Sequence, residues 1–127
     1  MEIGIKGLQS VIVTEENTAR SVGSGSLPVF ATPAMAALME KTAAKSVEPY
    51  LAEGEGTVGI SLNIRHLAAT PVGLTVECES ELIEIDRKRL VFKLKVSDGV
   101  DLIGDGTHER FIINNDKFMA KAEAKKS

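Results

Sequence analysis

The sequence predicts an α+β fold in which one curved antiparallel sheet wraps around one long helix. One helical stretch near residues 33–47 is followed by several stretches in which apolar and polar residues alternate. A run of strands after a single helix favours an antiparallel sheet over the alternating strands and helices of a parallel one. The 127 residues are enough for one hydrophobic core, so we expect a single domain over residues 1–127, with a polar tail from about residue 119.

The composition excludes several classes of protein. Hydrophobic residues make up 43% of the chain and charged residues 26%, as in an ordinary folded domain. A net charge of -3 gives no general attraction for nucleic acid, and no stretch reaches the roughly 20 apolar residues that span a membrane. No signal-peptide pattern is visible, so we expect a cytoplasmic location. The single cysteine, Cys78, cannot form an internal disulfide, and neither a metal site nor a cofactor motif is predicted.

The first third of the chain contains weak strand patterns and a loop. Residues 3–14 include an apolar run, and residues 18–22 could form a further short strand. The segment 23–28 is rich in glycine and serine, which predicts a loop.

The helix has a clear start and end in the sequence. Thr32 can cap free backbone donors, and Pro33 suits the first helical position because it has no N–H to satisfy. Pro49 disfavours helical geometry in the residue before it. We therefore expect a helix from Pro33 to about Val47.

The remainder of the chain alternates with the two-residue period of strands. The phase slips at Ile83, which predicts a bulge in the second of these strands, and a glycine bulge is expected within residues 104–106 of the last. The four expected strands cover residues 58–66, 74–85, 89–96 and 102–113.

Glu40 is the unusual residue of the predicted helix. Residues 33–39 are wholly apolar, so the first two turns are expected to be buried nearly all round. A carboxylate in an apolar setting is costly unless it is protonated, hydrogen-bonded or paired, and such groups cluster at functional sites. Alternatively, Glu40 reaches a solvent gap or pairs with a lysine. A second subunit could cover the small residues around it, which predicts a homodimer with Glu40 near the interface; these residues are Ala36, Ala37, Ala43 and Ala44.

Two further polar residues could join Glu40. His66 continues the core-facing parity of Val58, Ile60, Leu62 and Ile64, with Gly59 on the other face, so its imidazole should emerge on the helix side. Such a histidine is either a packing residue or, beside a buried glutamate, an acid–base group. Thr32 lies eight residues from Glu40, roughly 12 Å along an ideal helix, so it either only caps the helix or reaches the substrate from elsewhere, including a second subunit.

His108 and Arg110 share one face of the last predicted strand. Arg110 could bind a phosphate of a ligand, or it could simply pair with a glutamate.

Several separated blocks of the sequence resemble the fluoroacetyl-CoA thioesterase-like family of the hotdog fold. The blocks lie in the family's order and spacing and cover most of the chain from about residue 29 to residue 121. They are Val29-Phe30-Ala31-Thr32, Leu38-Met39-Glu40, His66 with Ala68-Ala69-Thr70-Pro71, Gly73-Leu74-Thr75-Val76, and Gly106-Thr107-His108-Glu109-Arg110.

The resemblance implies a dimeric hotdog enzyme that hydrolyses an acyl-CoA thioester to free acid and CoA without a cofactor. It places Thr32, Glu40 and His66 at the catalytic positions and Gly59 where the backbone contacts the thioester, with Arg110 as a candidate substrate-binding residue. Glu40 would attack the thioester carbonyl or activate water, and the sequence does not choose between these.

One segment departs from the family pattern. The member specialised for fluoroacetyl-CoA carries a phenylalanine lid where this chain reads Gly23-Ser24-Gly25-Ser26. A glycine–serine loop cannot supply an aromatic plug, so we expect a wider or different range of short acyl-CoA substrates and no selectivity for fluoroacetyl-CoA. The alternative is a hotdog protein that binds acyl-CoA or a related small ligand without turning it over.

Overall fold

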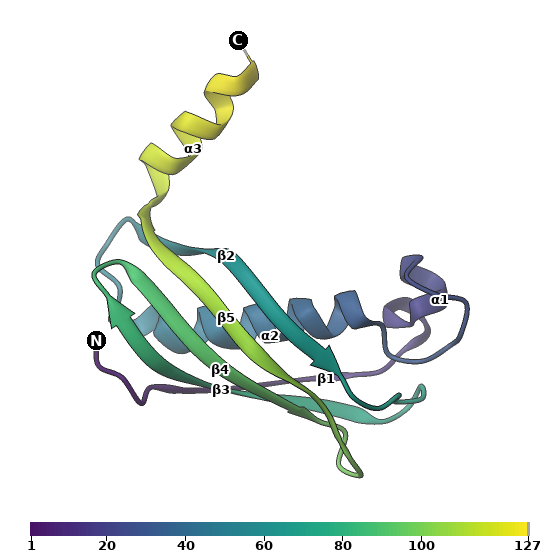
Figure 1. Ribbon diagram of the computed structural model, residues 1–127. Helices are drawn as coiled ribbons and strands as arrows, with labels where there is room; N and C mark the ends of the chain where they lie inside the picture. Colours follow the sequence, from purple (N-terminus) through teal and green to yellow (C-terminus); the bar gives the residue numbers. More distant parts are fainter. Residues whose placement is uncertain (127) are drawn as a thin grey trace.

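A curved antiparallel sheet wraps around helix α2 (Thr32–Val47) in the computed structural model, which describes residues 1–126 (Figure 1). The five strands lie in the order β1-β3-β4-β5-β2, so β1 and β2 form the edges. This arrangement confirms the predicted α+β class. The strands are β1 (Lys6–Ile12), β2 (Glu55–His66), β3 (Thr75–Asp86), β4 (Arg89–Ser97) and β5 (Leu102–Asn114).

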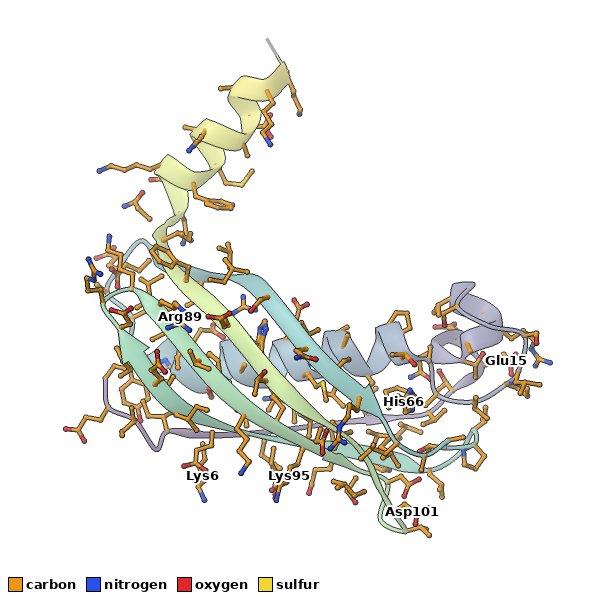
Figure 2. All side chains as sticks on the ribbon, viewed as in Figure 1. Lys6, Glu15, His66, Arg89, Lys95 and Asp101 are labelled. Carbon is orange, nitrogen blue, oxygen red and sulfur yellow. The ribbon has the colours of Figure 1, made fainter. Side chains whose placement is uncertain are left out.

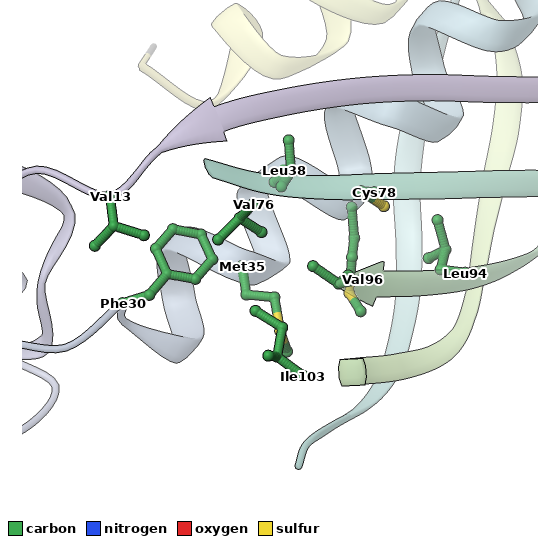
Figure 3. Close-up of a cluster of buried hydrophobic side chains, with 10 residues drawn as sticks. Val13, Phe30, Met35, Leu38, Val76, Cys78, Leu94, Val96 and Ile103 are labelled. Atoms are coloured by element: carbon green, nitrogen blue, oxygen red, sulfur yellow. The ribbon is translucent and has the colours of Figure 1, made fainter. Parts of the chain in front are cut away.

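The hydrophobic core fills the space between α2 and the concave face of the sheet. Met35, Leu38 and Met39 of α2 pack against buried side chains of β3, β4 and β5, among them Val76 and Ile103 (Figure 3). The pattern of β4 is confirmed, since all four of its predicted inward residues are buried: Leu90, Phe92, Leu94 and Val96.

Cys78 lies within this core and is fully buried. Burial disfavours the thiolate and raises the pKa of Cys78 to about 11. Its predicted role as a small buried apolar residue is confirmed.

The segment before α2 folds differently from the prediction. Residues 18–22 do not form a strand, because the short helix α1 (Ala19–Val22) occupies them. Thr18 caps α1, because its side chain accepts a hydrogen bond from the Ser21 backbone N–H, and its strand-like pairing is limited to an isolated bridge to Phe30. The hydroxyl of Thr18 therefore supports a helical turn, which strand propensity alone does not reveal.

Register shifts occur at one predicted and two unpredicted positions. The bulge at Ile83 is confirmed, because the β3–β4 register shifts between Leu82 and Glu84. The glycine bulge expected within residues 104–106 is wrong. Gly106 sits in regular pairing with Ile64, and a Cβ there would lie 2.5 Å from the Asn63 carbonyl oxygen, so this glycine allows close strand approach.

The other two shifts fall at isoleucines. The β4–β5 register changes at Ile103, and the β2–β5 register changes between Gly59 and Ser61, which leaves Ile60 as the extra residue.

Helix α3 (Asn115–Glu123) and the turn Ala124–Lys126 follow β5 and point away from the sheet (Figure 1). The predicted polar tail from about residue 119 is therefore mostly helical in the part that the structure describes. Asn114 starts α3 by accepting a hydrogen bond from the Lys117 backbone N–H at 3.0 Å. Within residues 1–126, no helix is both long and apolar enough to cross a membrane.

Gly7 allows β1 to lie against α2. A Cβ at this position would lie 2.6 Å from Ser80 Oγ and 2.8 Å from both Ser46 Cβ and the Thr42 carbonyl oxygen. We expect Gly7→Ala to lower the free energy of unfolding by about 1–3 kcal/mol, because the helix must shift to admit the methyl group. Urea unfolding at fixed protein concentration measures this. Gly25→Ala, whose Cβ has no neighbour closer than 3.3 Å, is the control, and equal stability of the two variants would contradict the packing argument.

Candidate active site

Thr32 and His66 lie in direct contact at the start of α2 and the end of β2. Thr32 Oγ1 is 2.7 Å from His66 Nδ1. The cap position of α2 belongs to Ala31, which makes no side-chain cap, and Thr32 is the first helical residue. The predicted capping role of Thr32 is therefore wrong, and its hydroxyl instead fixes one nitrogen of the imidazole.

The second nitrogen of His66 has no partner in its own chain. Nε2 is buried and makes no hydrogen bond within the described residues. Burial lowers the pKa of His66, while the nearby backbone of Ala68 has the smaller, opposite effect. Figure 2 shows His66 where β2 ends, close to the first turn of α2. His66 Nε2 is therefore a buried polar atom without a hydrogen-bond partner among the described residues, which is uncommon in a folded protein.

Backbone contacts hold the start of α2 against the loop after β2. The Phe30 N–H donates to the Thr70 carbonyl at 2.9 Å, and the Thr70 hydroxyl donates to Asp98 Oδ2 at 2.8 Å. Asp98 Oδ1 in turn accepts from the backbone N–H groups of Val100 and Asp101. The turn between β4 and β5 therefore supports the segment that positions Thr32.

This support should make stability depend on pH. The Asp101 N–H lowers the pKa of Asp98, with help from Thr70, so the carboxylate stabilises the fold above its unfolded pKa and this contribution is lost as pH falls through the folded value. We expect Asp98→Asn to be less stable than wild type at pH 7 by about 1–2 kcal/mol. Thermal unfolding from pH 7 to pH 3 should show the two proteins converging in acid; a constant difference would contradict the assignment.

Glu40 lies further along α2 and faces a different set of groups. Its Oε2 is 4.0 Å from Arg110 Nη1, and its side chain is 47% exposed. Beside it, Ala36 and Ala44 are half-buried and Ala37 is exposed. The prediction that the first two turns of α2 are buried on nearly all sides is therefore wrong for a single chain. The charged group nearest to Glu40 is Arg110, not a lysine.

Gly59 faces Glu40, contrary to the expected parity of β2. The bulge at Ile60 turns that side chain outward, where it is 53% exposed, and places Gly59 opposite Arg110. A Cβ on Gly59 would lie 3.5 Å from Glu40 Oε2 and 3.2 Å from His108 Cε1. A glycine within a strand indicates that another group approaches the backbone closely, and this signal was present at Gly59. The apolar side chain of Ile60 suggested the opposite parity and so placed Gly59 on the outer face.

Arg110 is 8% exposed and is held by its own chain. Its Nε and Nη2 donate to the Thr57 hydroxyl and carbonyl at 2.8 and 2.9 Å, and its Nη1 donates to His108 Nε2 at 3.1 Å. Burial lowers the pKa of Arg110, and Glu40 opposes this effect. Thr57 was not predicted from the sequence, because only the strand register brings it to Arg110.

The structure thus places the predicted site residues in two groups within one chain. Thr32 and His66 form the first group, and Glu40, Gly59 and Arg110 form the second. Thr32 and Glu40 are separated by eight residues of α2, about 12 Å of helix. No hydrogen bond or ion pair among the described residues joins the groups.

The comparisons with known proteins agree with this architecture. The family model described as fluoroacetyl-CoA-specific thioesterase matches residues 13–116. This chain belongs to that family. The fluoroacetyl-CoA thioesterase of Streptantibioticus cattleyicolor is 46% identical over 97 residues, which are 76% of this chain and 70% of the relative.

The similarity to solved structures covers the whole fold. A mutant fluoroacetyl-CoA thioesterase in complex with acetyl-CoA matches with a TM-score of 0.94 and 38% identity, over 100% of both chains. A Thermus thermophilus protein described as a thioesterase superfamily member matches with a TM-score of 0.91 and 30% identity, over 98% of this chain and 93% of the other. The hotdog fold and thioester hydrolase class expected from the sequence are confirmed.

Substitution of Gly59 tests the group formed by Glu40, Gly59 and Arg110. In Gly59→Ala the methyl group would lie 3.2 Å from His108 Cε1, which is a tight contact, and 3.4 and 3.5 Å from Arg110 Nη1 and Glu40 Oε2, which is close to ordinary van der Waals contact. If Glu40 takes part in the reaction, we expect kcat to fall by about 10-fold or more, because a shift of His108 would also move Arg110, which faces the carboxylate. Steady-state kinetics with thermal unfolding as a companion measurement tests this. Full activity in a folded Gly59→Ala protein would show that Glu40 does not depend on the absence of a side chain at position 59.

Proposed function

We propose that this protein hydrolyses short acyl-CoA thioesters to free acid and CoA without a cofactor, with Thr32, Glu40 and His66 as its catalytic residues. The hydrogen bond between Thr32 and His66 carries the proposal. It uses a hydroxyl at the start of a helix to orient an imidazole whose other nitrogen is buried and unpaired. Such an arrangement suits proton transfer better than packing, since an unpaired buried polar atom is a cost to stability.

The chemistry follows from the two groups of side chains. Glu40 either attacks the thioester carbonyl or takes a proton from the water that attacks it. The oxygen adds to the carbonyl carbon to give a tetrahedral oxyanion, whose collapse breaks the C–S bond. If Glu40 activates water, the proton that leaves the water is passed by His66 to the departing sulfur. If Glu40 attacks, the departing thiolate takes a proton from solvent, and a water deprotonated by His66 then hydrolyses the acyl–Glu40 anhydride. The Gly59 N–H would stabilise the developing oxyanion, and Arg110 would hold the Glu40 carboxylate. The buried hydrogen bonds of Arg110 favour this positioning role over a phosphate contact.

A homodimer would bring the two groups together. The edge of β2 is open, and the alanine face of α2 is partly exposed, so a second copy can cover both. In a two-fold dimer, residue i of one protomer meets residue j of the other and the reverse. Ala36 lies midway between Thr32 and Glu40 on α2, so an axis near Ala36 would set Thr32 and His66 against the partner's Glu40.

The substrate range should be wider than fluoroacetyl-CoA. The loop before α2 contains exposed residues without an aromatic side chain, including Leu27 at 63% exposure. The nearest aromatic residue, Phe30, is 1% exposed and is packed in the hydrophobic core (Figure 3). It cannot also act as a movable plug over a small acyl pocket.

A panel of acyl-CoAs tests the function. Release of free thiol is measured for fluoroacetyl-CoA, acetyl-CoA and longer short-chain thioesters, with Glu40→Ala and His66→Ala as controls. We expect turnover of several members by wild type and large losses in both variants. Binding of acyl-CoA without thiol release would favour the alternative, a hotdog protein that binds a ligand without hydrolysing it.

A further inference from the structure

We propose that His108 is a positioning residue for the proposed catalytic carboxylate and acts on Glu40 through Arg110. The inference rests on the proposed function of Glu40 and adds to it a residue without any contact to the substrate. His108 stands on β5 opposite Leu62 and is 1% exposed, so its ring is out of reach of solvent.

The hydrogen bonds of His108 define one neutral tautomer. Nδ1 lies 2.8 Å from the Ser61 carbonyl oxygen, which can only accept, so Nδ1 carries the hydrogen. Nε2 lies 3.1 Å from Arg110 Nη1, and because a guanidinium can only donate, Nε2 must accept. Both ring nitrogens are therefore used, and the ring cannot flip without losing both bonds.

Arg110 transmits this constraint to Glu40. Thr57 binds Nε and Nη2, which leaves Nη1 as the nitrogen that faces the carboxylate at 4.0 Å. His108 takes one hydrogen of Nη1, and the planar guanidinium then fixes the direction of the other. The position of the charge facing Glu40 is thus set jointly by Thr57 and His108.

Protonation of His108 would oppose this arrangement. A hydrogen on Nε2 would point at Nη1–H and place a second positive charge against Arg110. Burial and the charge of Arg110 lower the pKa of His108, whereas the Ser61 carbonyl, Glu40 on α2 and Glu109 on β5 act in the opposite direction. The neutral, accepting form is the one that the contacts require.

Two amide substitutions separate positioning from simple packing. In His108→Gln an amide oxygen can take the place of Nε2 and accept from Arg110, whereas in His108→Asn an amide nitrogen can take the place of Nδ1 and donate to Ser61. Each variant keeps one of the two hydrogen bonds. If His108 acts through Arg110, kcat for His108→Asn should be at least about 10-fold below that for His108→Gln, with KM similar in both. Equal losses, or losses confined to KM, would overturn the proposal.

A second pair of variants tests the same proposal at Thr57, in case the His108 variants do not fold. Thr57→Val removes the hydroxyl that binds Arg110 Nε, and Thr57→Ser keeps it, so kcat should fall for valine and be largely restored in serine. His108→Asn and Thr57→Val are also combined with Glu40→Gln, where neither should lower the residual rate further. An additional loss there would show that His108 acts by another route. If Glu40→Gln alone proves fully active, the proposed function fails instead, and the two failures remain distinct.

Discussion

Glu40→Gln is expected to lower kcat by at least about 100-fold, the scale of losing a general base or a nucleophile. The amide keeps the size of the side chain but can neither take a proton from water nor attack a carbonyl. Acyl-CoA turnover by the purified protein measures the loss. Glu48→Gln is the matched control, because Glu48 directly follows α2 and its exposed side chain forms a surface ion pair with Lys45 at 3.3 Å. A Glu40→Gln protein with wild-type kcat would refute the assigned role.

The same residue decides between the two forms of the mechanism. If Glu40 is the nucleophile, rapid acid quenching during turnover should trap an acyl group on the peptide that contains it, detected by mass spectrometry. If Glu40 activates water, the peptide should keep its unmodified mass while product accumulates. Both outcomes are compatible with the loss expected in Glu40→Gln.

Mixing two inactive variants is expected to restore activity if each site uses residues from both protomers. In a heterodimer of Glu40→Gln and His66→Ala, one site carries both lesions and the other carries none. Random reassortment of subunits makes half of the dimers mixed, each with one intact site, so about a quarter of wild-type activity should return. This is a large recovery from two proteins that are each nearly inactive.

The recovery requires exchange of subunits, for which the variants are unfolded together and refolded or are co-expressed. Mixing Glu40→Gln with Thr32→Ala should give the same recovery, because Thr32 and His66 belong to one group. Mixing Thr32→Ala with His66→Ala should restore nothing, since each site then keeps one lesion. If no pair recovers while native mass spectrometry of differently tagged variants shows mixed dimers, each site lies within one protomer and the proposed sharing is wrong.

Much of the fold could be predicted because its signals are local. Pro33 and Pro49 mark the helix in neighbouring residues, and the alternation of β4 is regular over its whole length. The bulge at Ile60 has no local signal in the sequence, because an isoleucine suits either face of an edge strand. It reversed the parity of the first half of β2, which is why Gly59 was assigned to the wrong face.

The site could be predicted in part for the same reason. Glu40 stands out as the charged residue in an apolar stretch of helix, and His66 keeps its expected parity because the bulge precedes it. The contacts of Thr57 and His108 with Arg110 depend on the pairing of β2 with β5, which local pattern does not specify. Thr32 has an equally good local explanation as a helix cap, and the structure removes it because Ala31 holds the cap position and the Thr32 hydroxyl contacts His66.

The buried cysteine of the core has a practical consequence for experiments on this protein. Thioester hydrolysis is followed most simply with a dye that reacts with each thiolate as CoA is released. Cys78 is the only cysteine in the chain, it is enclosed by the core, and its raised pKa leaves almost no thiolate at neutral pH. The folded enzyme should therefore not react with the dye, and a slow signal from the protein in the absence of acyl-CoA would report unfolded molecules.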